Sequence, residues 1–341
     1  MHMANELLSV PVAVGGFALS GVWLAAVCHK VKNGAVGSNA ALMGIMGAFI
    51  FAAQMVNFKL PIMPGTSGHL VGAVLLSIIL GPHLAMITLS SVVIIQCLIF
   101  QDGGILALGC NILNMVIVPV YIGHFIYKNM TAGNSSRGRL YLASIIASVT
   151  ALEAGAILVP FEVELSGVLS IPVLSFLATM AGVHLLVGIM EGLITAAVLV
   201  YIMSVRPQVI GFSGNGSSLS PKSFATVIMI ITVVVAGGVS LIASDKPDGL
   251  EWSYAERPDQ KDFKPIIEND DIVIAKADVF QAKYSFLPDY AARTAVVGNV
   301  NEISDESHGW RSFAGVCGAL ITMALIGAVS WFLRRKAAAV R

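Results

Sequence analysis

Charged residues are scarce in this sequence. Only 12% of its 341 residues are Asp, Glu, Lys or Arg, whereas 56% are hydrophobic, and the mean hydropathy is +0.83. Soluble domains carry about 25% charged residues. The composition therefore excludes an ordinary soluble domain and predicts a polytopic membrane protein in contact with lipid. The formal net charge is zero, so bulk electrostatics predicts no nucleic-acid partner.

Several catalytic and redox motifs are also missing. The four cysteines are widely separated within apolar stretches and form no CxxC pair, so no disulfide framework is predicted. No GxxxxGK[ST] loop is present, which excludes ATP hydrolysis through that motif. HExxH is absent too, and an intramembrane metalloenzyme remains a distant alternative. The first apolar run has no basic residues before it, so a cleaved signal peptide is not expected.

Nine hydrophobic segments follow one another along the chain. A membrane-spanning helix needs about 20 apolar residues, or fewer where it is buried among other helices. The expected segments are residues 7–28, 40–56, 69–81, 82–100, 105–127, 140–159, 173–203, 224–243 and 313–333. The third is short, and Pro82 separates it from the fourth. The sequence therefore predicts an all-α polytopic membrane protein.

Basic residues in the short loops predict the orientation. With the N-terminus outside the cell, the inner loops and tail contain Lys30, Lys32, Lys128, Arg137, Arg139, Arg206, Lys222, Arg334, Arg335, Lys336 and Arg341. The short outer loops contain a single basic residue, Lys59. This bias follows the positive-inside rule. It predicts a multi-pass protein of the cytoplasmic membrane of a prokaryote, with the N-terminus outside and the C-terminus inside.

A polar, Gly- and Ser-rich stretch at residues 206–222 divides the sequence into two modules. The first covers residues 1–205 and the second residues 223–341. The second module has two spans joined by an outer loop at 244–311. Apolar residues alternate in Asp271-Ile272-Val273-Ile274-Ala275, which favours one short strand in this loop.

The first two residues, Met1 and His2, form a metal-chelating motif. A free α-amine, the amide nitrogen of residue 2 and the imidazole of His2 can close two fused chelate rings on one ion. A second imidazole would complete a square of four nitrogens, a geometry that suits Ni(II) or Cu(II), and Co(II) less well. The topology places His69 on the same side of the membrane as the N-terminus. We therefore predict a metal site formed by Met1, His2 and His69.

Other polar residues lie near the predicted site or inside the spans. Ser67, Asp102, Asn111 and Asn114 are candidates to orient the ligands, although an Asn in a span more often bonds a neighbouring helix. His184 and Glu191 share one helix face. A polar contact between helices or with a partner subunit is favoured for this pair over a metal site.

Small residues recur every four positions at Ala40, Gly44 and Ala48. Such spacing lets another helix approach closely. It fits packing within the chain and docking of another membrane subunit equally well.

Four sequence runs resemble the substrate-capture proteins of energy-coupling-factor nickel and cobalt transporters, NikM and CbiM. They are Met1-His2, Pro64-Gly65-Thr66-Ser67-Gly68-His69-Leu70-Val71-Gly72, residues 100–115 around Asn111 and Asn114, and Glu191-Gly192-Leu193-Ile194-Thr195. Pro247-Asp248-Gly249-Leu250-Glu251-Trp252, between two spans, is similar to the small partner protein NikN or CbiN. The whole chain thus resembles a natural fusion of the two.

The resemblance implies a bundle of seven helices, made of a six-helix core and an added N-terminal helix, followed by two further spans. It implies Ni(II) as the transported substrate, held by Met1, His2 and His69, with Co(II) uptake for cobalamin supply as the alternative. It also implies a transmembrane coupling protein and two cytoplasmic ATPases as partners. No organic cofactor and no enzymatic activity of the chain itself are expected.

Overall fold

The computed structural model describes residues 1–31, 35–60, 62–63, 65–133, 136–210, 219–254, 267, 269, 271–292 and 306–338. Within these ranges, the side chains of residues 35–38, 306–308 and 334–338 are not described. Lys32 and Arg341, which were used to predict the orientation, and residues 211–218 of the linker therefore lie outside the described residues.

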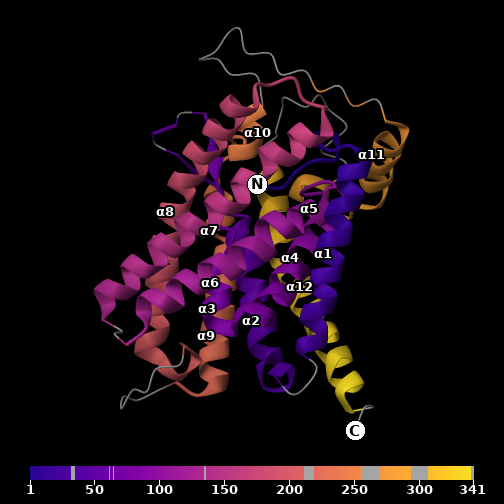
Figure 1. Cartoon of the computed structure of the whole chain (residues 1–341). Helices are drawn as coiled ribbons and strands as arrows, with labels where there is room; N and C mark the ends of the chain where they lie inside the picture. The colour runs from indigo at the N-terminus through magenta and orange to yellow at the C-terminus, as the bar shows by residue number, and fades with distance from the viewer. Residues whose placement is uncertain are drawn as a thin grey trace.

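The described chain is almost entirely helical (Figure 1). Its α-helices are α1 (Val10–Lys30), α2 (Ala35–Gln54), α3 (Ala73–Leu80), α4 (Pro82–Phe100), α5 (Leu108–Ile112), α6 (Val118–Thr131), α7 (Arg137–Ser166), α8 (Val173–Val205), α9 (Pro221–Gly237), α10 (Gly249–Tyr254), α11 (Ile272–Tyr284) and α12 (Glu306–Ala338). A π-helical turn, η2 (Leu113–Ile117), joins α5 to α6, and short 3-10 turns are η1 (Asn5–Leu7), η3 (Pro207–Ile210), η4 (Val239–Ile242) and η5 (Pro288–Tyr290).

Seven of the described helical segments are long and apolar enough to cross a membrane, and α2 and α3 add two shorter apolar helices. The predicted all-α polytopic fold is therefore confirmed. The helix boundaries differ from the sequence-based ones where helices run on beyond the apolar core. In particular, α7 continues through Pro160 to Ser166, and its Glu162 accepts a hydrogen bond from Asn114 at 2.6 Å.

Helix α4 lies at the centre of the bundle and is the most buried of the spans (Figure 1). The N-terminus, α10 and α11 lie at one end of the bundle, drawn at the top, and the C-terminus lies at the opposite end. We call these the upper and lower ends. The outer segments of the second module are therefore placed beside the N-terminal residues of the first.

The small residues of α2 lie against α12. A Cβ atom added at Gly44 would come within 3.3 Å of Met323, and one at Gly47 within 2.3 Å of Ile326. Ala48 is fully buried, and Ala40 is half-buried one turn below Gly44. At Gly44 and Gly47 this face packs within the chain, between the first module and the second. Docking of another membrane subunit at Ala40, Gly44 and Ala48 stays a prediction.

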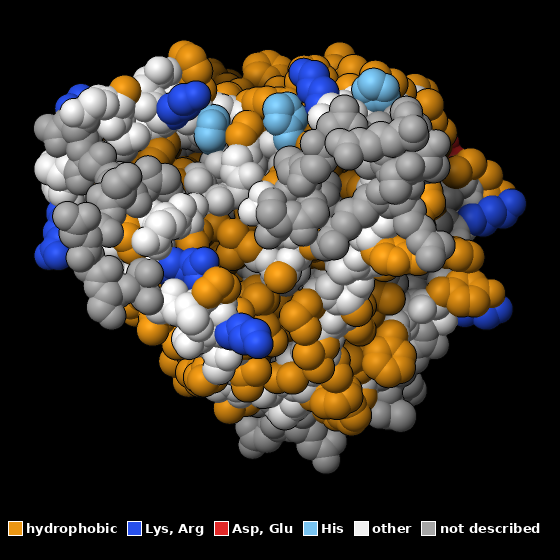
Figure 2. All heavy atoms as spheres, turned by 90° about the horizontal axis from the view of Figure 1, so that it is seen from below, with side chains coloured by type: hydrophobic (Ala, Val, Ile, Leu, Met, Phe, Trp, Pro, Cys, Tyr) orange, Lys and Arg blue, Asp and Glu red, His pale blue; other side chains and the backbone are white. Residues whose placement is uncertain are grey.

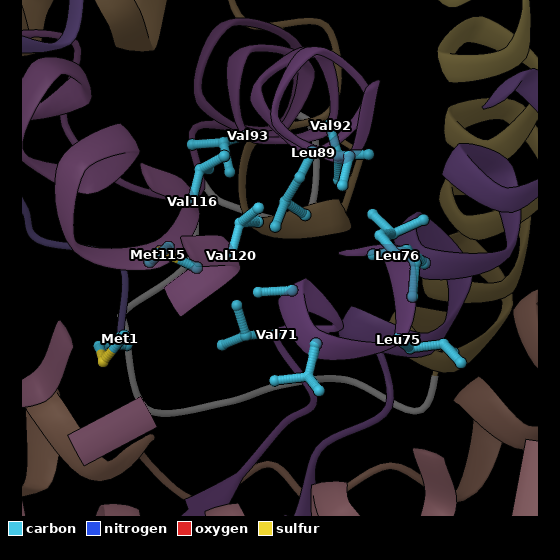
Figure 3. Close-up of a cluster of buried hydrophobic side chains, with 14 of the residues drawn as sticks. Met1, Val71, Leu75, Leu76, Leu89, Val92, Val93, Met115, Val116 and Val120 are labelled. Carbon is cyan, nitrogen blue, oxygen red and sulfur yellow. The ribbon is translucent and has the colours of Figure 1, made fainter. Parts of the chain in front are cut away.

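A buried apolar cluster anchors the N-terminus at the upper end. Met1 and Met3 are 3% and 0% exposed. Figure 3 shows Met1 at the margin of a cluster contributed by the segment before α3, by α3 itself, by α4 and by η2 and α6. Its labelled members are Val71, Leu75, Leu76, Leu89, Val92, Val93, Met115, Val116 and Val120. Burial of these first side chains fixes the position of the terminal amine.

Figure 2 shows the molecule from the lower end, where Lys, Arg and His side chains are spread over the surface and acidic side chains are nearly absent among the described residues. The basic ends of the helices are gathered here, as the loop charges predict. The surface between them is largely hydrophobic.

The predicted strand at residues 271–275 is wrong, because this segment begins α11. The Asp271 side chain accepts a hydrogen bond from the Val273 N–H and caps the helix. So short a run cannot distinguish the two-residue period of a strand from the 3.6-residue period of a helix. An Asp at the N-cap position favours the helix.

Candidate metal-capture site

A small hairpin brings His69 to the upper end of the bundle. Strand β1 (Phe58–Lys59) pairs in antiparallel fashion with β2 (Ser67–Gly68). After His69 the chain enters α3, and two buried side chains hold this turn. Gln54 donates to the Val71 carbonyl at 2.7 Å, and the Glu191 carboxylate accepts from the N–H of Val71 at 2.8 Å.

The terminal amine of Met1 lies 3.3 Å from Nε2 of His69. His69 is 8% exposed, and its Nδ1 faces the Leu70 carbonyl at 3.1 Å. A carbonyl oxygen accepts, so Nδ1 carries the proton and Nε2 presents its lone pair to the amine. In a square of nitrogens with metal bonds of about 2 Å, adjacent nitrogens are about 2.8 Å apart. The observed pair is close to that spacing.

His2 lies next to His69. The two imidazole rings are stacked, with their centroids 5.6 Å apart and their planes inclined by 12°. Nδ1 of His2 lies 3.0 Å from a carboxylate oxygen of Asp102, and Nε2 lies 3.3 Å from Oε1 of the buried Gln96. The structure thus brings together all three predicted ligand residues, and polar side chains contact both ring nitrogens of His2.

Asp248 of the second module completes the immediate surroundings. Its carboxylate forms an ion pair with the Met1 amine and lies 3.7 Å from Nε2 of His69. The other carboxylate oxygen accepts from the N–H groups of Leu250 and Glu251, at 2.8 and 2.9 Å. Asp248 therefore begins α10 as an N-cap while it also binds the N-terminus of the first module.

The protonation states suit metal capture. Burial, together with the positive charge of the nearby N-terminus, lowers the pKa of His69, so its imidazole is neutral at neutral pH. Burial alone would raise the pKa of Asp248, but the positive N-terminus and His69 hold it well below its ordinary value. Burial also opposes ionisation of Asp102, yet the contacts with His2 and the hydrogen bond from Tyr290 keep its pKa low.

The predicted orienting residues lie around the three ligand residues. Asn111 accepts from the Met3 N–H at 2.8 Å and donates to the Met3 carbonyl at 3.2 Å, which fixes the chain directly after His2. Asn114 reaches Glu162 at 2.6 Å and the Met3 sulfur at 3.8 Å, so it supports Met3 rather than a ligand. Ser67 donates to the Lys246 carbonyl at 2.7 Å.

The second module contributes two further supports. Tyr290 donates to Asp102 at 2.6 Å, on the carboxylate that contacts His2. Gln281 of α11 donates to the carbonyls of Cys97 and Gly103, and its own Oε1 accepts from Asn5. These bonds tie α11 to the end of α4, to the loop after it and to the segment after the N-terminus.

His184 and Glu191 have separate partners in the structure. Nδ1 of His184 faces the Met180 carbonyl at 2.8 Å, whereas Glu191 binds the main chain at Val71 and Gly72. Glu191 therefore holds the segment that follows His69. His184 lies nearer the upper end and lines a small pocket together with Met1 and His69.

A hollow of about 400 Å³ leads to this site between the two modules. His69, Asp102 and Asp248 form part of its wall, and its remaining charged lining residues are Asp245, Lys246, Glu251, Asp289 and Arg311. Acidic residues outnumber basic ones, which favours cations. In the described part of the chain, no group of three or more His, Cys, Asp or Glu side chains forms a metal cluster. The ligand set argued above therefore depends on main-chain nitrogens as well as on two imidazoles.

Two known family models match this chain. Residues 2–209 match the family model CbiM, described as the cobalt uptake substrate-specific transmembrane region. The chain belongs to the CbiM family. Residues 222–335 match the PDGLE domain, whose five letters are the residues from Pro247 to Glu251. The second module of this CbiM-family chain is therefore a PDGLE module, and Asp248 is the Asp of that motif.

Relatives of this CbiM-family chain are named as nickel or cobalt transport proteins. One relative is an Archaeoglobus fulgidus protein provisionally named fused nickel transport protein NikMN. It is 34% identical over 247 residues, which cover 72% of this chain and 80% of the relative. The cobalt transport protein CbiM of Geobacter sulfurreducens is 26% identical over 274 residues, covering 75% and 77%. A crystal structure of a truncated transition metal transporter is 32% identical, with a TM-score of 0.52, and covers 60% of this chain and 98% of that one.

The predicted resemblance is thus confirmed, and a multi-pass membrane protein of a metal-transport family is established. Sequence reasoning did not single out Asp248, Gln96, Gln281 or Tyr290 as residues of the site. The signal for Asp248 was the run from Pro247 to Trp252, which is similar to NikN or CbiN. The sequence alone assigned no function to the Asp248 carboxylate.

Proposed function

We propose that this protein captures Ni(II) at the outer face of the cytoplasmic membrane and delivers it to an ATP-driven importer. The observation that carries the proposal is the 3.3 Å separation between the Met1 amine and Nε2 of His69, with the His2 ring stacked beside them. The ligands would be the Met1 amine, the amide nitrogen and Nδ1 of His2, and Nε2 of His69. This all-nitrogen set favours a square-planar ion.

Capture would proceed by exchange of partners. A hydrated cation enters the acidic hollow, the Met1 amine leaves Asp248, and Nδ1 of His2 leaves Asp102. Both carboxylates stay beside the new complex and balance its charge. Because the amine and the amide must lose protons, capture releases protons and is pH-dependent.

The orientation and the partners belong to the same proposal. The basic lower end in Figure 2 supports a cytoplasmic position for that end, and hence an outer position for the metal site. The described residues contain no P-loop sequence, so energy would come from two cytoplasmic ATPases through a transmembrane coupling protein, as in energy-coupling-factor importers. Co(II) is the second candidate substrate, because the relatives include proteins named for cobalt as well as for nickel.

Uptake into vesicles tests this function. The chain is reconstituted with coupling and ATPase subunits, and accumulation of radioactive nickel is followed with and without ATP. We expect accumulation only with ATP and with active ATPase subunits. Equal nickel entry without ATP would contradict an importer and indicate a passive channel.

A further inference from the structure

A small pocket lies between the proposed ligands and α8. It has room for about one water molecule, at about 10 Å³, and its polar lining consists of Met1, His69, His184 and Asp248. The rest of its wall is made by Gly68, Val71, Leu152, Val187 and Gly249. A compartment of this size beside three of the proposed ligand and partner groups is suited to a single ligand atom or water.

His184 presents one nitrogen to this pocket. The side chain is 96% buried, since its exposed fraction is 4%. Its Nδ1 faces the Met180 carbonyl one turn earlier in α8, at 2.8 Å, so Nδ1 carries the proton. Nε2 is then a lone-pair donor, and no hydrogen bond to it is seen within the described residues. A buried imidazole held in this tautomer is the usual form of a metal-binding histidine.

The PDGLE module packs directly onto this ring. A Cβ atom added at Gly249 would come within 3.3 Å of Cε1 of His184 and within 2.4 Å of Val183. Glycine at this position therefore lets the segment carrying Asp248 approach α8. The same close contact limits the pocket to its present size and keeps His184 beside the metal site.

We infer that His184 is an additional, axial ligand of the captured ion, acting through Nε2 directly or through one water molecule, and that it determines how well Co(II) is accepted. This inference rests on the proposed capture site and extends it by one residue. The four equatorial nitrogens suffice for low-spin Ni(II), which needs no axial ligand. Co(II) binds more favourably with five or six ligands, so the axial nitrogen matters mainly for cobalt.

Metal affinities of His184→Leu test the inference. Ni(II) and Co(II) dissociation constants are measured separately for the full-length protein. We expect Co(II) affinity to fall about tenfold or more, and Ni(II) affinity to change less than about threefold. Val187→Ala is the matched control, because it alters the same pocket without removing a nitrogen and should change both affinities by the same factor. An equal loss of both metals in His184→Leu would overturn the inference.

Electron paramagnetic resonance of Co(II)-loaded wild-type protein gives a second test that needs no variant. A five- or six-coordinate spectrum supports the axial ligand, and a four-coordinate low-spin spectrum contradicts it. Failure of the underlying capture site would look different. The wild-type protein would then bind neither metal, or the His2→Ala variant would bind both metals as tightly as the wild type does.

Discussion

The two modules contribute different kinds of group to the site. The first module supplies every proposed equatorial nitrogen, through Met1, His2 and His69. The PDGLE region supplies contacts to these residues or to their neighbours, through Asp248, Gln281 and Tyr290. Ligand chemistry is therefore concentrated in the first module, whereas pre-organisation is divided between the two.

The contacts from the second module explain why the site needs that module as well as the N-terminal residues. Three nitrogens on a free N-terminus would be mobile, and ordering them would reduce the affinity. Here Asp248 holds the amine beside His69, and Gln281 holds the segment after it through Asn5. The comparison predicts large effects for changes to the nitrogens and smaller effects for changes to the PDGLE contacts.

The largest effect is expected for His69→Ala. Loss of a residue that supports a ligand typically weakens metal binding about 10- to 100-fold. Loss of the direct ligand His69 should cost more, and we expect Ni(II) binding to weaken about 1,000-fold. Isothermal titration of the purified protein measures it. His29→Ala is the matched control, because His29 is an exposed histidine at the other end of α1, and it should bind as the wild type does. Tight binding by His69→Ala would place the metal elsewhere.

Acidification should have the next largest effect. Capture requires a deprotonated amine and amide, so we expect Ni(II) affinity to fall about 100-fold or more between pH 8 and pH 5. His69 contributes little to this loss, because burial and the positive N-terminus lower its pKa and its ring stays neutral to a lower pH than an ordinary histidine. Competition with a chelator at several pH values measures the slope. A flat affinity over this range would exclude an amide ligand.

Asp248→Asn tests the contribution of the PDGLE module. The substitution removes the ion pair with the Met1 amine and a negative charge beside the bound cation. We expect Ni(II) binding about tenfold weaker. Glu164→Gln is the matched control, because Glu164 is an exposed carboxylate near the end of α7 and is not among the residues that line the hollow. Equal affinities for the two variants would mean that the second module does not support the site.

The smallest effect is expected for Tyr290→Phe. It removes one hydrogen bond, at 2.6 Å, from the Asp102 carboxylate and leaves the contact between Asp102 and His2 in place. Ni(II) binding should weaken about threefold, which corresponds to one ordinary hydrogen bond. Tyr284→Phe, on the exposed side of α11, should have no effect. A tenfold loss in Tyr290→Phe would show that support from the second module is as strong as that from Asp248.

Much of this arrangement could be predicted from the sequence. Hydrophobic length and loop charge depend on local composition, so the helices and the common side of Met1, His2 and His69 followed from them. The helix that covers Gly44 could not be predicted, because small-residue spacing shows that a helix approaches without identifying it. Asp248 was missed for a similar reason, since its contact with Met1 joins the two ends of the fold.

The visible spectrum of nickel-loaded protein, beside that of the His2→Ala variant, tests the central claim most directly. The substitution keeps the terminal amine and the length of the chain but removes the imidazole that closes the second chelate ring. We predict one nickel ion per wild-type chain, with a yellow d–d band at about 400–500 nm typical of square-planar nitrogen ligation, and loss of this band in His2→Ala. An unchanged band and stoichiometry in His2→Ala would contradict the N-terminal site.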